Sequence, residues 1–142
     1  MNKYRMMKNQ QQERVNAFLH EHAFFAFDKG QYLQGLEKLG LTEADAGQLV
    51  AISGGGYLPQ EYADELTGLL QSFRQERQEA VNDQETGRQF AIDMFAAVLN
   101  DYEYGYTGDT GEALEALQLT QEEINSDPVL KDALETAMQK YR

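Results

Sequence analysis

The feature that most constrains the fold is an apolar run at residues 90–99. Nine of its ten residues are apolar, and Asp93 is the exception. Ala91, Met94 and Leu99 within the run are also good helix formers. A helix that is apolar all round has to be covered on every side. The sequence therefore predicts a central helix over residues 88–101, with amphipathic segments packed around it.

Asp93 is the one ionisable residue inside this run. A buried carboxylate needs a partner, because an unpaired charge in an apolar environment is costly. We therefore expect Asp93 to be at least partly buried and to face a tyrosine hydroxyl, an arginine or a helix N-terminus.

Length and composition indicate one small domain. A chain of 142 residues with 42% hydrophobic content is long enough to bury a real core, so we expect a single domain over residues 1–142. No apolar run approaches twenty residues, and the first residues lack the apolar core of a signal peptide. The absence of cysteine excludes disulfides, thiolate zinc sites and cysteine nucleophiles. We expect a cytoplasmic protein.

Helix start signals recur along the chain, and they predict a mainly α fold. A first helix is expected over residues 2–22, and further starts are indicated at Asp28, Thr42, Pro59, Thr110, Thr120 and Asp127. The expected fold is a compact single-domain helical bundle of five to seven helices with at most a minor two-stranded β element. Residues 23–27 are a short strand or a buried connector, and the alternating tyrosines after residue 101 indicate a strand or an extended loop.

Two further local patterns bear on the fold. Residues 52–57 are expected to end the helix that starts at Thr42, and the glycines 54–56 indicate unusual backbone torsions there. Residues 36–45 align with residues 114–123 without a gap. In each segment a helix ends, a leucine points inward and a threonine caps the next helix. We interpret this repeat as convergence on capping chemistry, because the matching window is short.

The sequence offers no catalytic or metal-binding constellation. His20 and His22 point about 200° apart on a helix, so they do not form a zinc site. Residues 101–112 resemble a calcium loop only in part, because Gly105 and Tyr106 occupy positions that need an oxygen ligand and a glycine. The glycines 54–56 lack the lysine and hydroxyl of a phosphate-binding loop. We expect a non-catalytic protein with no cofactor and no tightly bound metal.

The charge distribution is the most informative guide to function. Residues 1–60 carry six acids and six bases, so the remaining chain holds the whole net charge of −12. Residues 89–130 contain nine acids and no lysine or arginine. Such a field repels nucleic acids and membrane phosphates and attracts basic surfaces. The alternative is that the acidity only keeps the protein soluble.

Several stretches resemble an uncharacterised family. They are residues 24–27 with Gln31, residues 39–41 and 52–57, and then residues 102–104, 107–110 and 119–124 with Leu114 and Leu117. They resemble those of small acidic proteins encoded on bacterial phages and mobile elements, a domain of unknown function. The resemblance implies a mobile-element context. In charge, small acidic proteins of that context resemble inhibitors of CRISPR nucleases or restriction systems, which occupy nucleic-acid channels.

The leading hypothesis is a protein-binding module that acts as a nucleic-acid mimic and docks on a basic surface of a nucleic-acid-binding effector. The candidate partner-binding residues are Asp101, Tyr102, Glu103, Tyr104, Tyr106, Asp109 and Glu112. Tyrosine beside carboxylate suits an interface, because the ring buries area and the charge steers encounter. The open alternative buries the tyrosines and leaves the acids as solvated turn residues. A competing function is a structural or regulatory accessory protein, with a homodimer as one form.

Overall fold

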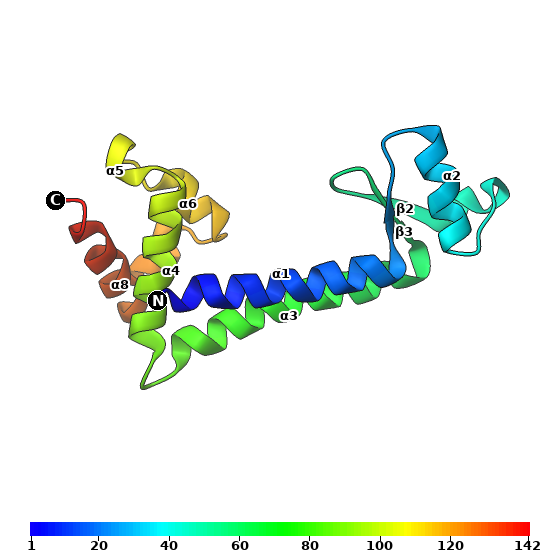
Figure 1. The fold of residues 1–142 in the computed structure, drawn as a ribbon. Helices are drawn as coiled ribbons and strands as arrows, with labels where there is room; N and C mark the ends of the chain where they lie inside the picture. Colours follow the sequence, from blue (N-terminus) through cyan, green and yellow to red (C-terminus); the bar gives the residue numbers. More distant parts are fainter. The chain divides into compact units, whose positions relative to one another are not determined.

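A computed structural model describes all 142 residues of the chain, which are mainly helical (Figure 1). In chain order the elements are α1 (Lys3–His22), β1 (Phe24–Phe25), α2 (Lys29–Lys38), the 3₁₀ helix η1 (Glu43–Gln48), β2 (Leu49–Ile52), β3 (Gly56–Pro59), the 3₁₀ helix η2 (Gln60–Tyr62), α3 (Ala63–Asn82), α4 (Gly87–Asp101), α5 (Tyr104–Thr107), α6 (Gly111–Ala116), α7 (Gln121–Asn125) and α8 (Pro128–Gln139). The predicted mainly α class is confirmed. There are more helices than the five to seven expected, because several are only one or two turns long. None of the helices combines the length and the apolarity needed to cross a bilayer.

Two compact units make up the chain. Unit 1 consists of residues 1–9 and 75–142, and unit 2 consists of residues 10–74. Helix α1 begins in unit 1 and ends in unit 2, whereas α3 begins in unit 2 and ends in unit 1. The expectation of one domain over residues 1–142 stays a prediction.

Helix α4 is the core of unit 1. Nine of its residues are buried, and Phe95 and Leu99 have no exposed surface. It lies against α8 and also packs on α5 and α6 (Figure 1). The central apolar helix expected over residues 88–101 is therefore present almost at its predicted bounds. The prediction that the whole chain is organised around it is wrong, because unit 2 builds a core of its own.

A three-stranded antiparallel sheet lies in unit 2, with strand order β1-β3-β2. The prediction of at most two strands is therefore wrong. Leu49 and Val50, which were expected on a helix, are instead the first residues of β2. Gly54 and Gly55 have φ values of +82° and +83° and form the turn between β2 and β3. An apolar stretch followed by glycines at positive φ is typical of a β-hairpin, and here that pattern outweighs the helix start at Thr42.

The aromatic residues of unit 2 join the sheet to α2. The ring of Phe24 stacks on Tyr57 with centroids 5.3 Å apart, and both rings pack against Tyr32 of α2. Gly35 lies directly against the Phe24 ring, which leaves no room for a Cβ atom there. Of the two alternatives for residues 23–27, a short strand or a buried connector, the structure shows a short strand, and its first phenylalanine anchors this core.

The tyrosine-rich segment after α4 is helical. Residues 104–107 form α5, so the expected strand or extended loop is wrong. Glu103 at φ 58° ends α4 sharply and Gly108 at φ 70° closes α5, which leaves one helical turn between two left-handed residues. The alternating tyrosines have no neighbouring strand to pair with in unit 1, and alternation alone does not form a strand.

Candidate protein-docking site

Asp93 caps a helix that lies far away in sequence. Its Oδ2 atom accepts a hydrogen bond of 2.8 Å from the backbone N–H of Lys3, the first residue of α1. Its Oδ1 atom accepts a second, also of 2.8 Å, from Nε2 of Gln89. The side chain is half-buried, so the predicted burial and the predicted helix N-terminal partner are both confirmed.

Asp101 is the first of the predicted docking residues, and it is ion-paired within unit 1. The Arg5 guanidinium donates to both of its carboxylate oxygens, at 2.8 and 3.1 Å. These hydrogen bonds hold the pKa of Asp101 below its ordinary value and raise that of Arg5. Arg5 also donates to the backbone carbonyl of Ala97 at 3.3 Å. Asp101 therefore ties the start of the chain to α4, and its charge is already matched.

Two other shifted pKa values reflect local structure. Burial raises the pKa of Tyr4, whose ring packs edge-on against Phe90 with centroids 6.1 Å apart. The backbone N–H groups of Thr86 and Glu85 donate to Asp83 and lower its pKa, which stabilises the turn before α4. Neither group belongs to the docking residues.

The three predicted tyrosines divide between surface and core. Tyr106 is 94% exposed and Tyr102 is 41% exposed. Tyr104 packs against the core of unit 1 and meets Tyr141 edge-on, with ring centroids 5.2 Å apart. Two of the three therefore offer an aromatic surface beside Glu103, and the third holds α5 in place.

Five of the nine acids in residues 89–130 have a structural partner. Besides Asp93 and Asp101, the side chains of Asp109, Glu123 and Asp127 accept backbone N–H bonds at or near the starts of α6, α7 and α8. The side chains of the four that remain are exposed and make no hydrogen bond or ion pair, namely Glu103, Glu112, Glu115 and Glu122. Of the acids predicted to bind a partner, Glu103 and Glu112 are thus unmatched, whereas Asp101 and Asp109 are engaged.

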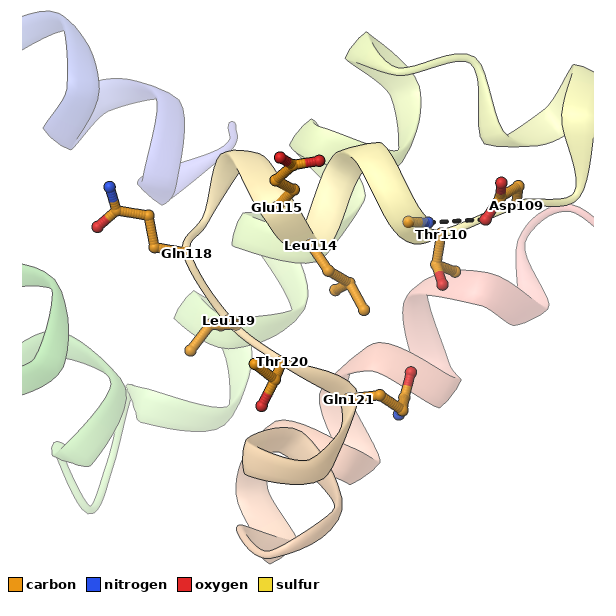
Figure 2. Close-up of a pocket in the computed structure, with 9 residues that line it drawn as sticks. Asp109, Thr110, Leu114, Glu115, Gln118, Leu119, Thr120 and Gln121 are labelled. Carbon is orange, nitrogen blue, oxygen red and sulfur yellow. Dashed lines mark hydrogen bonds between the residues drawn. The ribbon is translucent and has the colours of Figure 1, made fainter.

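An open groove of about 590 Å³ lies between α6 and the start of α7 (Figure 2). Its lining residues are Asp109, Thr110, Gly111, Leu114, Glu115, Gln118, Leu119, Thr120 and Gln121. Leu114 is 5% exposed and Leu119 is half-buried, so the floor of the groove is apolar. The lining carries two carboxylates and no base. We will call this feature the α6–α7 groove.

Sequence reasoning placed only Asp109 of these lining residues in the candidate site. The others were assigned to helix ends and caps, since residues 114–123 match residues 36–45 as a capping pattern. The excess of acids around that pattern could have indicated a charged surface there. Only the fold shows that α6 and α7 leave space between them.

The chain has no group of three or more histidine, aspartate or glutamate side chains placed to hold a metal ion together. His22 stacks on Tyr62 with ring centroids 4.0 Å apart and meets Phe18 at 4.8 Å. The expectation that the protein binds no metal tightly stays a prediction.

The fold and the groove together define a small, mainly α protein with an acidic surface on unit 1. The chain belongs to the family of unknown function DUF7659, whose model matches residues 3–140. No curated protein and no solved structure matches the chain.

Proposed function

We propose that the protein is a non-catalytic binding module that docks through unit 1 on a basic surface of another protein. The observation that carries this proposal is the set of four exposed glutamates whose side chains have no partner. All four lie within residues 89–130, a segment that contains no lysine or arginine. Five neighbouring acids already have a hydrogen-bond or ion-pair partner within the fold, and these four are the carboxylates with no such contact.

Both units carry a net negative charge, so the assignment to unit 1 rests on its segment 89–130, which has nine acids and no base. Unit 1 carries 15 acids and eight bases, a net charge of −7, and unit 2 carries nine acids and four bases, a net charge of −5. Like charge on a surface steers an oppositely charged partner and raises the association rate. Exposed Tyr102 and Tyr106 supply the aromatic area that interface anchors use.

The narrower form of the proposal concerns the partner. A surface rich in carboxylates resembles the phosphate backbone in charge, so the partner of this nucleic-acid mimic is a protein whose own ligand is nucleic acid. With the mobile-element context that the sequence resemblance implies, this makes the protein an inhibitor of a host defence nuclease of the CRISPR or restriction type, acting in the cytoplasm. Direct binding of nucleic acid or a membrane is disfavoured by the same charge.

A second candidate function rests on unit 2. Phe27 is 82% exposed and Phe25 is 45% exposed, and both lie beside the glycine turn of the β-hairpin. Exposed phenylalanines favour an apolar contact, such as that of a homodimeric accessory protein whose acidity only confers solubility. An apolar dimer resists salt, whereas a charge-driven complex weakens steeply as ionic strength rises.

The experiment is a pull-down from host lysate at low and high salt with a charge-reversed variant of unit 1. The variant replaces Glu103, Glu112 and Glu115 by lysine and leaves Asp109 unchanged, because Asp109 serves the start of α6. The matched control replaces Glu37, Glu43 and Glu61 of unit 2 by lysine. The side chains of these three glutamates are also exposed and unpaired. We expect only the first variant to lose the partner. Equal retention of the partner by both variants contradicts the proposal.

A further inference from the structure

The α6–α7 groove has a surplus of hydrogen-bond acceptors. Oδ1 of Asp109 accepts from the Gly111 backbone N–H at 2.8 Å, and its Oδ2 has no partner. Nε2 of Gln121 donates to Asn125 at 3.0 Å, which leaves its Oε1 without one. The carboxylate of Glu115 is also unpaired. These acceptors are complementary to a hydrogen-bond donor, and the two carboxylates of the lining favour a cation.

The side chains are arranged around an apolar floor. Figure 2 shows Leu114, Thr110 and Gln121 turned toward the space between α6 and α7, with Glu115 and Gln118 projecting from the other side of the turn that ends α6. The side chains of Leu114 and Leu119 supply the apolar part of the groove lining. This combination suits a side chain with an aliphatic stem and a cationic head.

Gln118 carries a side chain where the backbone favours glycine. Its φ is +56°, and the corresponding residue of the aligned segment in unit 2 is Gly40, at φ +72°. The backbone hydrogen bonds are the same in both segments: Leu119 N–H donates to Leu114 O at 3.0 Å, and Leu41 N–H donates to Leu36 O at 2.8 Å. A left-handed residue with a side chain is strained relative to glycine. The Gln118 side chain is exposed and its amide makes no hydrogen bond within the chain, so it is available to a ligand.

We propose that the α6–α7 groove binds an arginine-bearing extended segment of the partner protein. The guanidinium donates to Asp109 and Gln121, and the arginine stem covers Leu114 and Leu119. The segment then crosses the turn that ends α6, where the Gln118 amide bonds its backbone. Arginine is favoured over lysine because its planar head has five donors and no acceptor, which matches several acceptors at once. This inference rests on the proposed function, since it names the chemistry by which the acidic surface recognises its partner.

The test is a nuclear magnetic resonance titration of the full chain with a defined probe, N-acetyl-Leu-Arg-Leu amide. Two matched probes carry lysine or citrulline in place of arginine. We expect the amide signals of residues 109–121 to shift with the arginine probe, to shift less with lysine and not to shift with neutral citrulline. Equal shifts with arginine and citrulline, or shifts confined to other residues, would overturn the inference.

Three variants make the titration specific. Asp109→Asn keeps an oxygen for the Gly111 N–H and removes the charge, so Kd should rise about tenfold. Gln118→Gly should raise Tm by about 3 °C and yet weaken probe binding. Glu37→Gln is the control, because Glu37 of unit 2 aligns with Glu115 and lies outside the groove; it should leave Kd unchanged. A Gln118→Gly protein that is more stable and binds the probe as well as the wild type contradicts the role of Gln118.

The groove variants also separate this inference from the proposed function. If the lysine variant of Glu103, Glu112 and Glu115 loses the cellular partner and Asp109→Asn keeps it, the acidic surface docks but the groove does not bind arginine. If both variants keep the partner, both proposals fail.

Discussion

Residues 36–41 of unit 2 and residues 114–119 of unit 1 share one pattern of backbone hydrogen bonds, although Lys38 and Gly40 of unit 2 are replaced by Ala116 and Gln118 in unit 1. In both, the sixth residue donates its N–H to the carbonyl of the first, at 2.8 Å in unit 2 and 3.0 Å in unit 1. In both, the fifth residue has positive φ and a threonine starts the next helix. The same pattern of hydrogen bonds therefore accommodates two different surfaces.

The differences lie in the charges and in the helix that follows. The Lys38 ammonium of unit 2 donates hydrogen bonds to the backbone carbonyls of His20 and Ala23, at 2.8 and 3.1 Å. The aligned residue in unit 1 is Ala116, which has no charge. After Thr42 the N–H of Asp45 donates to the Thr42 carbonyl at 2.9 Å and a 3₁₀ helix forms. After Thr120 the N–H of Glu123 donates to the threonine hydroxyl at 3.1 Å and an α-helix forms. The unit 2 segment uses its cation within the fold, whereas the unit 1 segment has no cation and leaves the side chains of Glu115 and Glu122 unpaired.

The largest expected effect comes from the leucine that opens each segment. Leu36 is 2% exposed and Leu114 is 5% exposed, so truncation of either to alanine should lower the free energy of unfolding by about 2–4 kcal/mol. Hydrogen exchange should show lost protection mainly in unit 2 for Leu36→Ala and mainly in unit 1 for Leu114→Ala. Uniform loss of protection in both variants would show that the two units unfold together, as the single-domain prediction requires.

Exchanging the left-handed residues tests whether the two backbones are equivalent. Gly40→Gln should lower the free energy of unfolding by about 1–2 kcal/mol, because glutamine at φ +72° is strained. Gln118→Gly should raise it by about 0.5–1 kcal/mol, the relief of strain minus the extra chain entropy of glycine. Urea unfolding measures both. Changes of the same sign would break the comparison.

The threonine caps should differ in strength. Thr120→Ala removes the acceptor of the Glu123 N–H and should cost about 1 kcal/mol. Thr42→Ala leaves the Asp45 N–H bonded to a backbone carbonyl, so the cost should be about half as large. The measurement is again urea unfolding, with Ser53→Ala as the control, because Ser53 is exposed and lies outside both caps. Equal losses of unfolding free energy would show that the two threonines stabilise their helices equally, which contradicts this prediction.

The smallest effect concerns the acid sensitivity of unit 1. The folded pKa of Asp101 is below its unfolded value, so its pairing with Arg5 stabilises the protein above about pH 4 and loses that contribution as pH falls through the folded pKa. Both side chains are nearly half exposed, so Asp101→Asn should lower the free energy of unfolding by only roughly 0.5 kcal/mol at pH 7. The difference from wild type should shrink as the pH is lowered from 7 to about 3. A difference that is the same at both pH values would show that it does not come from the Asp101–Arg5 ion pair. Glu37→Gln is the unit 2 control and should change neither value.

Much of the fold could be predicted because its signals are local. Asp28, Thr120 and Asp127 each accept a hydrogen bond from a backbone N–H two or three residues ahead, so a short sequence window contains both partners. The β-hairpin was missed because the helix start at Thr42 continues only as a 3₁₀ turn before Leu49 begins a strand. Strand pairing depends on Tyr57 and Phe24, which that window does not contain.

The candidate site was predicted only in part for the same reason. Exposed Glu103, Tyr106 and Glu112 follow from a polar, glycine-rich stretch. The pairing of Asp101 with Arg5 spans 96 positions, and the half-burial of Tyr104 depends on Tyr141. Charge counting identifies the acidic region. Only the folded contacts reveal which carboxylates are already engaged.

The cap that Asp93 places on α1 has a consequence for the order of folding during synthesis. The N–H of Lys3 leaves the ribosome early, yet the carboxylate that it bonds is added 90 residues later. Until then the Lys3 N–H has solvent in place of that acceptor, and Oδ1 of Asn2 caps only the Arg5 N–H; a helix frays where its first N–H groups are uncapped. Nascent chains that end before residue 93 should therefore carry a frayed N-terminus, and chains that extend past α4 should protect it.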